Sequence, residues 1–179
     1  MCIDVYGLME ASVRYLTKAM ILVSLMLSAA IFGFFYAWVC STMWGLDAAD
    51  PRVAIQAMQA MNASVRNFVF APAFFGTPVA LALTAFFLMR EGNGRSAASF
   101  ALAAGVYFVL GLLLTVRINV PMNEALAMVI VPDDAASARA IWQDYSGPWQ
   151  FWNQTRTMTS GVAFLLAVSG VMLLERKPV

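Results

Sequence analysis

Two polar stretches of this chain carry side chains whose types and spacing could do chemistry. The first is Arg117-Ile-Asn-Val-Pro-Met-Asn123, in which Asn119 and Asn123 are four residues apart. A helix would place both amides on one face. Each amide offers N–H donors and a carbonyl acceptor, so the pair could bind the oxygens of a polar ligand.

The second stretch, from Trp149 to Arg156, combines aromatic, amide and cationic groups. Its spacing i, i+3, i+4, i+7 puts four side chains on one helical face: Trp149, Trp152, Asn153 and Arg156. A third group precedes an apolar run: Asn62, Arg66 and Asn67. Indoles stack on planar rings, amides bind carbonyl or phenol oxygens, and a guanidinium holds an oxyanion. The combination favours a planar, oxygenated ligand.

A purely structural interpretation stays open for the same residues. Aromatic side chains at the ends of membrane helices often form an interfacial belt. Arginines there often extend to the surface or pair with acids. The convergence of several amides and arginines, with few acids nearby, favours a site over this interpretation.

Apolar runs must position these stretches: residues 19–44, 68–89, 96–116 and 157–174. A membrane-spanning helix needs about 20 predominantly apolar residues. The chain is 61% hydrophobic and 12% charged, whereas soluble domains contain about 25% charged residues. We therefore predict an all-α integral membrane four-helix bundle forming one domain over residues 1–179. An extramembrane helical and loop cap is expected between the third and fourth helices.

Local signals predict where the helices begin and end. Asp50-Pro51 and Asp133-Asp134 are typical of helix starts. Ser146-Gly-Pro148 predicts a break, after which Pro148 begins the final helix. Pro121 predicts a break or bend after the third span, because proline removes a backbone hydrogen bond.

The distribution of basic residues predicts the orientation in the membrane. One side collects six of them: Arg14, Lys18, Arg90, Arg95, Arg176 and Lys177. We expect both termini in the cytoplasm and the polar segments 45–67 and 117–156 on the other side, in a bacterial inner membrane.

Composition also argues against several functions. The chain has no histidine, which removes histidine-based haem, zinc and di-iron sites. The acids that could bind a metal match no calcium loop: Glu124, Asp133, Asp134 and Asp144. Cys2 and Cys40 do not suggest a disulfide framework, and a net charge of +1 argues against nucleic acid. We expect no metal and no cofactor.

Several motifs resemble the DUF1772 family of four-span membrane proteins, whose characterised branch is the anthrone oxygenases of polyketide pathways. The resemblance covers roughly residues 20–174. It rests on Gly33-Phe-Phe, Met58-Gln-Ala-Met-Asn62, Arg66-Asn67, Arg117-Ile-Asn-Val-Pro-Met-Asn-Glu-Ala-Leu126, Trp149 and Trp152-Asn-Gln-Thr-Arg156. Gln154 stands where family members often carry histidine, so histidine-based proton transfer is not expected here.

The resemblance implies oxidation of an anthrone-like phenolic substrate by O2 without metal or flavin. Arg117 and Arg156 would stabilise the developing anion. Three amides would orient its oxygens: Asn119, Asn123 and Asn153. Trp149 and Trp152 would stack on the rings, with Asn62, Arg66 and Asn67 completing the substrate site. Glu124 is the nearest acid in the sequence and hence a candidate general base.

A non-catalytic function is the alternative. The chain could be an accessory subunit of a larger membrane complex, or a protein that binds a quinone, pigment or lipid in the bilayer. The same polar cluster would then bind a head group or cap the helical bundle.

Overall fold

The computed structural model describes residues 5–175, and the side chains from residue 12 onward. Within this range the chain is helical and contains no strand. The α-helices are α1 (Val5–Ala37), α2 (Met43–Ala48), α3 (Pro51–Ser64), α4 (Thr77–Arg90), α5 (Gly94–Val106), α6 (Val120–Ala127) and α7 (Ala135–Met172). Four π-helical segments interrupt them: η1 (Trp38–Thr42), η2 (Pro72–Gly76), η3 (Tyr107–Leu113) and η4 (Thr115–Asn119). The predicted all-α class is confirmed.

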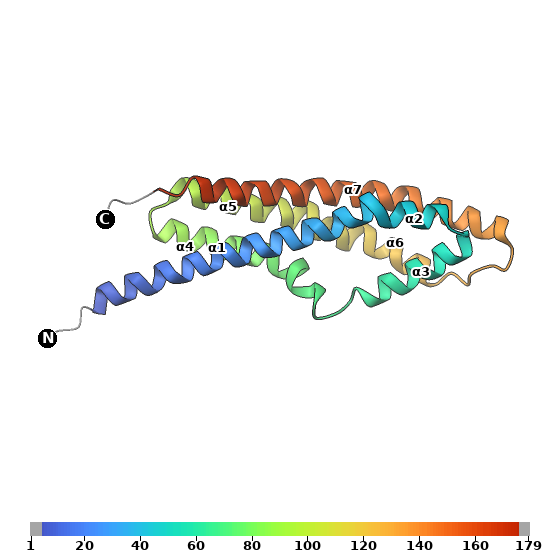
Figure 1. Ribbon diagram of the computed structural model, residues 1–179, viewed down its shortest axis with the longest axis horizontal. Helices are drawn as coiled ribbons and strands as arrows, with labels where there is room; N and C mark the ends of the chain where they lie inside the picture. Colours follow the sequence, from blue (N-terminus) through green and yellow to red (C-terminus); the bar gives the residue numbers. More distant parts are fainter. Residues whose placement is uncertain (1–4, 176–179) are drawn as a thin grey trace.

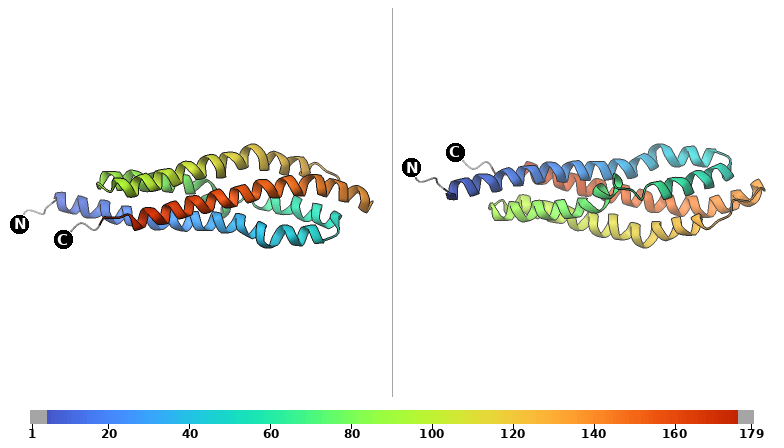
Figure 2. Two further views of the ribbon diagram at one scale, coloured as in Figure 1. Left: turned by 90° about the horizontal axis from the view of Figure 1, so that it is seen from above. Right: turned by 90° about the horizontal axis from the view of Figure 1, so that it is seen from below.

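The long helical segments lie side by side along one axis (Figure 1). α7 packs on α5 and α1, and α4 packs on α1 and α5. The start of α1, the turn between α4 and α5, and the end of α7 lie at one end of the molecule. α2, α3 and the loop 128–134 gather at the other end, where they form a cap on α7 (Figure 2).

Three helical stretches of the described chain are long and apolar enough to cross a membrane: Ser12–Ala48, Pro72–Arg90 and Gly94–Ala127. The fourth predicted span, residues 157–174, is not among them; its residues up to Met172 form the C-terminal part of α7. Polar residues such as Thr157, Thr159 and Ser160 lower the hydropathy of this segment. Thr157 and Ser160 are buried, so much of that polarity faces other helices rather than the surroundings.

Small and hydroxylated side chains allow the long helices to approach closely. The Ser96 hydroxyl donates to the Gly170 carbonyl at 2.6 Å, and the Ser99 hydroxyl to the Leu166 carbonyl at 2.7 Å. Both bonds join α5 to α7. Small residues and interhelical hydrogen bonds are the usual means of association where water is absent.

Helix α7 corrects one boundary prediction. It runs without interruption from Ala135 to Met172, so the expected break at Ser146-Gly-Pro148 is wrong. Proline at position 148 removes the hydrogen bond to the carbonyl of Asp144. Asp144 and Pro148 both lie on the exposed face, where other polar groups can satisfy that carbonyl. The helix therefore tolerates the proline.

Other boundary predictions have mixed outcomes. Both predicted helix starts are confirmed: the Asp50 side chain accepts the Arg52 N–H at 2.9 Å, and Asp134 accepts the Ser137 N–H at 2.8 Å. Pro121 does not break its helix: η4 continues directly into α6 within one helical stretch, Gly94–Ala127. The stretch continues although proline donates no backbone N–H to the preceding turn.

Candidate functional site

A cavity of about 480 Å³ lies where the long helices meet the cap. α1, η1, α3, η2, η4, α6 and α7 all contribute to its wall. Its aromatic lining consists of Phe34, Phe35, Trp38, Phe68, Phe70, Phe74, Phe75 and Trp149. Its polar lining consists of Asn62, Arg66, Asn67, Thr115, Asn123, Asn153 and Arg156. Seven of the ten predicted site residues therefore share one cavity.

The π-helical segments shape this cavity. η1 supplies Trp38, η2 supplies Phe74 and Phe75, and η4 supplies Thr115. A π-helical turn is wider than an α-helical one and is frequent at functional sites. Here three such turns direct large rings and a hydroxyl towards the same space.

Arg156 is the charged group at the core of the cavity wall, and it is only 5% exposed. Its Nη2 donates to Asn153 Oδ1 at 3.0 Å, and its Nη1 lies 3.4 Å from Thr115 Oγ1. Its Nε has no hydrogen-bond partner within the described part of the chain. The guanidinium lies over the rings of Phe35 and Trp149, at 4.7 and 5.4 Å from their centroids. Among the described residues, no acid forms an ion pair with it.

Asn153 holds this arginine in place. The amide is 1% exposed, accepts from Arg156, and donates through Nδ2 to the Phe35 carbonyl at 3.1 Å. One amide thereby connects α7 to α1 and fixes the guanidinium between them. Asn153 is a positioning residue, because these two bonds occupy both of its polar atoms.

Asn123 presents its amide N–H groups to the cavity. Its Oδ1 accepts from the Tyr145 hydroxyl and from Trp149 Nε1, each at 2.8 Å. Burial raises the pKa of Tyr145 above its ordinary value, so the phenol keeps its proton and can donate it. Since the carbonyl is bound by these two donors, the Nδ2 group is the part of the amide available to a ligand. Asn62 Nδ2 approaches the same Tyr145 hydroxyl at 3.4 Å.

Three predicted residues do not line the cavity. Arg117 is exposed, and Trp152 is half-buried with its ring against Phe151. Asn119 is completely buried, and both of its amide atoms lack partners among the described residues. Asn119, at the end of η4, is enclosed by protein, whereas Asn123, one turn later in α6, lines the cavity.

The mouth of the cavity lies beside the turn that precedes η2. Asn67 Oδ1 accepts from the N–H groups of Val69 and Phe70, so Asn67 stabilises this turn. Arg66 is exposed and lies 3.4 Å from Glu124. Glu124 itself is not part of the cavity lining.

Most of the aromatic wall could not be predicted from the sequence. Phe35, Trp38 and Phe74 are separated by tens of residues from Arg156, and nothing in their spacing connects them to it. Gly33-Phe-Phe, one of the motifs that carry the family resemblance, was the only pointer to Phe35. No motif in the sequence singles out Thr115 or Tyr145. Their importance to the site comes from their contacts with Arg156 and Asn123.

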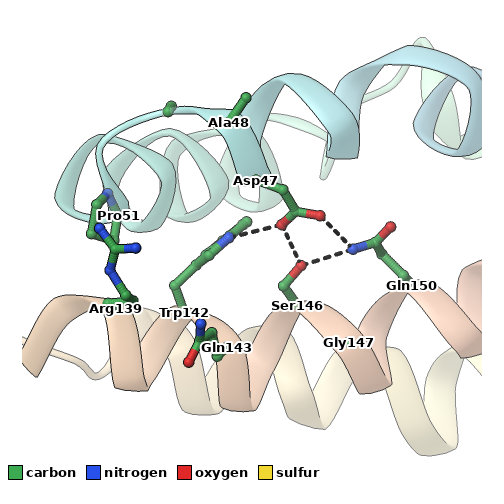
Figure 3. Close-up of a pocket in the computed structure, with 10 residues that line it drawn as sticks. Asp47, Ala48, Pro51, Arg139, Trp142, Gln143, Ser146, Gly147 and Gln150 are labelled. Atoms are coloured by element: carbon green, nitrogen blue, oxygen red, sulfur yellow. Dashed lines mark hydrogen bonds between the residues drawn. The ribbon is translucent and has the colours of Figure 1, made fainter. Parts of the chain in front are cut away.

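A second hollow of about 480 Å³ lies between the end of α2 and the first half of α7 (Figure 3). The Asp47 carboxylate accepts hydrogen bonds from Trp142 Nε1, Ser146 Oγ and Gln150 Nε2, at 2.9, 2.7 and 2.9 Å. These bonds join the cap to α7 and occupy both carboxylate oxygens (Figure 3). We interpret the Asp47 cluster as a structural connection.

The fold and the cavity define a class: an all-α protein with membrane-like helices around an aromatic cavity that contains a buried arginine. Residues 66–166, more than half of the chain, match the family model described as anthrone oxygenase. The chain belongs to this family, which confirms the resemblance to DUF1772 proteins. The matched region includes Asn123, Asn153 and Arg156, whereas Phe35, Trp38 and Asn62 lie before it. Comparisons with curated proteins and with solved structures found no significant match.

Proposed function

We propose that this protein oxidises an anthrone-like phenolic aromatic with O2 in the aromatic cavity. One observation carries the proposal: among the described residues Arg156 is buried without an acid partner, in a wall that also carries eight aromatic side chains. Such a wall suits a flat aromatic body. The guanidinium suits the oxyanion that forms when that body loses a proton.

The proposed reaction needs only the substrate and O2. Loss of a proton from the anthrone gives a delocalised anion, which can itself reduce O2 and form a carbon–oxygen bond. Departure of water then leaves a carbonyl in place of the CH2 group. One oxygen atom of O2 ends in the quinone and the other in water, so atoms and electrons balance.

The cavity residues take separate parts in this scheme. Arg156 and the Nδ2 group of Asn123 donate to the oxyanion, and Asn153 positions Arg156. Trp149 and Phe35 flank the ring system and exclude water. Asn62, Arg66 and Asn67 surround the entrance. We assign no ligand contact to Arg117, Asn119 or Trp152.

We also propose that the C-terminal part of α7 is a fourth span, and that both termini are cytoplasmic in a bacterial inner membrane. Two observations support this topology. The start of α1 and the end of α7 lie at the same end of the molecule, and Arg90 and Arg95 lie near that end. Arg176 and Lys177, which contributed to the charge argument, lie outside the described residues, as does Cys2.

Cysteine labelling tests the topology. Asn93→Cys and Ala135→Cys would be introduced separately into a chain whose Cys2 and Cys40 have been replaced by serine. A membrane-impermeant maleimide added to intact cells is expected to label position 135 and not position 93. Labelling of both positions from the same side would contradict four spans.

Oxygen consumption by the purified protein in detergent tests the reaction. Addition of anthrone is expected to consume one O2 per quinone formed, faster than in protein-free micelles. The Arg156→Met variant is the control for uncatalysed oxidation of anthrone, and its rate of O2 uptake would be compared with that of wild type. Binding of anthrone without faster O2 uptake would favour the alternative function, a protein that binds a quinone, pigment or lipid. Copurification of further subunits at fixed stoichiometry would favour an accessory subunit.

A further inference from the structure

The cavity wall carries positive charge but no group that could serve as a base at neutral pH. Its only ionisable lining residues are Arg66 and Arg156. Arg66 lies near Glu124 at the exposed mouth, whereas Arg156 is buried among rings, amides and a hydroxyl. Two buried phenols hydrogen-bond to lining residues, and both act as donors: Tyr145 to Asn123 Oδ1 and Tyr107 to the Phe74 carbonyl. Nothing in this wall can accept a proton from a ligand.

This arrangement changes the acidity of a ligand. A buried cation without a counter-ion is unfavourable, and an anion placed beside it offsets that penalty. The same interaction stabilises the ionised form of any acidic O–H group held there. The Nδ2 group of Asn123, which bonds to no described residue, adds a hydrogen-bond donor, which again favours the charged form.

We propose that the cavity itself ionises its phenolic ligand, and that no side chain acts as the general base. The ligand O–H bond breaks, the electron pair stays on the oxygen beside Arg156, and the proton passes to solvent at the mouth near Asn62 and Arg66. This inference deepens the proposed function, since it rests on the same cavity and the same ligand class. It nevertheless concerns binding alone and requires no reaction with O2.

A coloured phenol that anthrone chemistry cannot consume tests the inference. 2-Hydroxyanthraquinone is already a quinone, carries one phenol, and changes its absorption spectrum when that phenol ionises. Its apparent pKa would be measured by absorbance titration in detergent micelles, with and without the protein. We expect the protein to lower this pKa by about 1–3 units, the usual effect of an opposite charge at close range. Near pH 7 in weak buffer, binding should release protons to solvent.

Variants assign the shift to Arg156. Arg156→Met should abolish it, whereas Arg139→Met, the same change at an exposed position of α7, should retain it. Asn123→Asp provides an independent check, because a carboxylate in the wall should reduce the shift while preserving the acceptor for Tyr145 and Trp149. If Arg156→Met does not fold, the difference in the pKa of the bound probe between wild type and Asn123→Asp still tests the proposal.

Several outcomes would overturn the inference. They are a bound pKa equal to or above the micellar value, a shift that survives in Arg156→Met, and no binding of the probe. The proposed function can fail separately. A lowered probe pKa without anthrone-dependent O2 uptake would refute the oxygenase and leave ligand ionisation standing. Rapid O2 uptake without a lowered probe pKa would refute ligand ionisation and require another base.

Discussion

The guanidinium carbon of Arg156 lies 4.7 Å from the centroid of the Phe35 ring. The Phe35 carbonyl also accepts a hydrogen bond from Asn153. Asn153 and Arg156, three residues apart on α7, thus contact the backbone and the ring of the same residue of α1. Phe35 lies before the region that matches the family model, so the site depends on a helix outside that region.

Replacement of Arg156 by methionine is expected to separate function from stability. Replacing buried charged groups by apolar side chains of similar size is often neutral or stabilising. Loss of the bond to the buried Asn153 Oδ1 opposes this gain, so the melting temperature of Arg156→Met should stay near that of wild type. Binding of 2-hydroxyanthraquinone should weaken about 10- to 150-fold, the equivalent of one charge-assisted hydrogen bond of about 1.5–3 kcal/mol.

Arg156→Lys provides the conservative comparison. Lysine keeps the charge but lacks the planar fork that reaches Asn153 and stacks on rings. We expect normal folding with probe binding reduced roughly 10-fold or more. Full binding and full activity in Arg156→Lys would show that the planar guanidinium is not required.

Asn123 offers a pair of substitutions with opposite effects. Asn123→Leu would leave the Tyr145 hydroxyl and Trp149 Nε1 without their acceptor. Each unpaired buried donor costs about 1–3 kcal/mol, so the melting temperature should fall. Asn123→Asp retains an acceptor and should melt near wild type, yet its negative charge should weaken binding of the ionised probe. Equal melting temperatures for the two variants would contradict this account of the hydrogen bonds.

The Asp47 cluster is expected to contribute to stability and not to binding. Asp47→Ala removes the acceptor for Trp142, Ser146 and Gln150. We expect a loss of roughly 1–3 kcal/mol, since these bonds are charge-assisted but the carboxylate is exposed. Thermal unfolding would measure it, with Asp144→Ala, at an exposed position of α7, as the control. Loss of probe binding at a temperature where Asp47→Ala is folded would show that the two hollows are coupled.

Gly170 tests how closely α5 and α7 must approach. A Cβ atom there would lie 2.7 Å from Phe100 Cδ2 and 3.4 Å from the Ser96 carbonyl oxygen. Phe100 is completely buried and cannot move aside easily. Gly170→Ala should therefore destabilise the protein by about 1–3 kcal/mol.

Gly105→Ala is the control, because its Cβ would meet nothing within 4 Å. Alanine there should be neutral or stabilising, by up to about 1 kcal/mol, through its helix propensity. Similar melting temperatures for Gly105→Ala and Gly170→Ala would argue against the close contact.

The sequence by itself determined the class of the protein and most polar members of the site. Long apolar runs leave the chain few choices besides helices, because backbone groups in an apolar medium must bond within their own segment. The helical spacing of Trp149, Asn153 and Arg156 correctly put them on one face, since α7 is α-helical throughout. The caps at Asp50 and Asp134 followed from side-chain chemistry that acts over two or three residues.

The tertiary structure decided everything that depends on contacts between distant segments. Asn123 lines the cavity whereas Asn119 is enclosed by protein, and spacing along a helix does not show which residues the neighbouring helices will cover. The break at Pro148 does not occur, because the affected carbonyl lies on an exposed face of α7. Phe35 reaches Arg156 only because α1 packs on α7. Packing brings together side chains that are far apart in the chain. A local sequence pattern does not show which distant residues will be in contact.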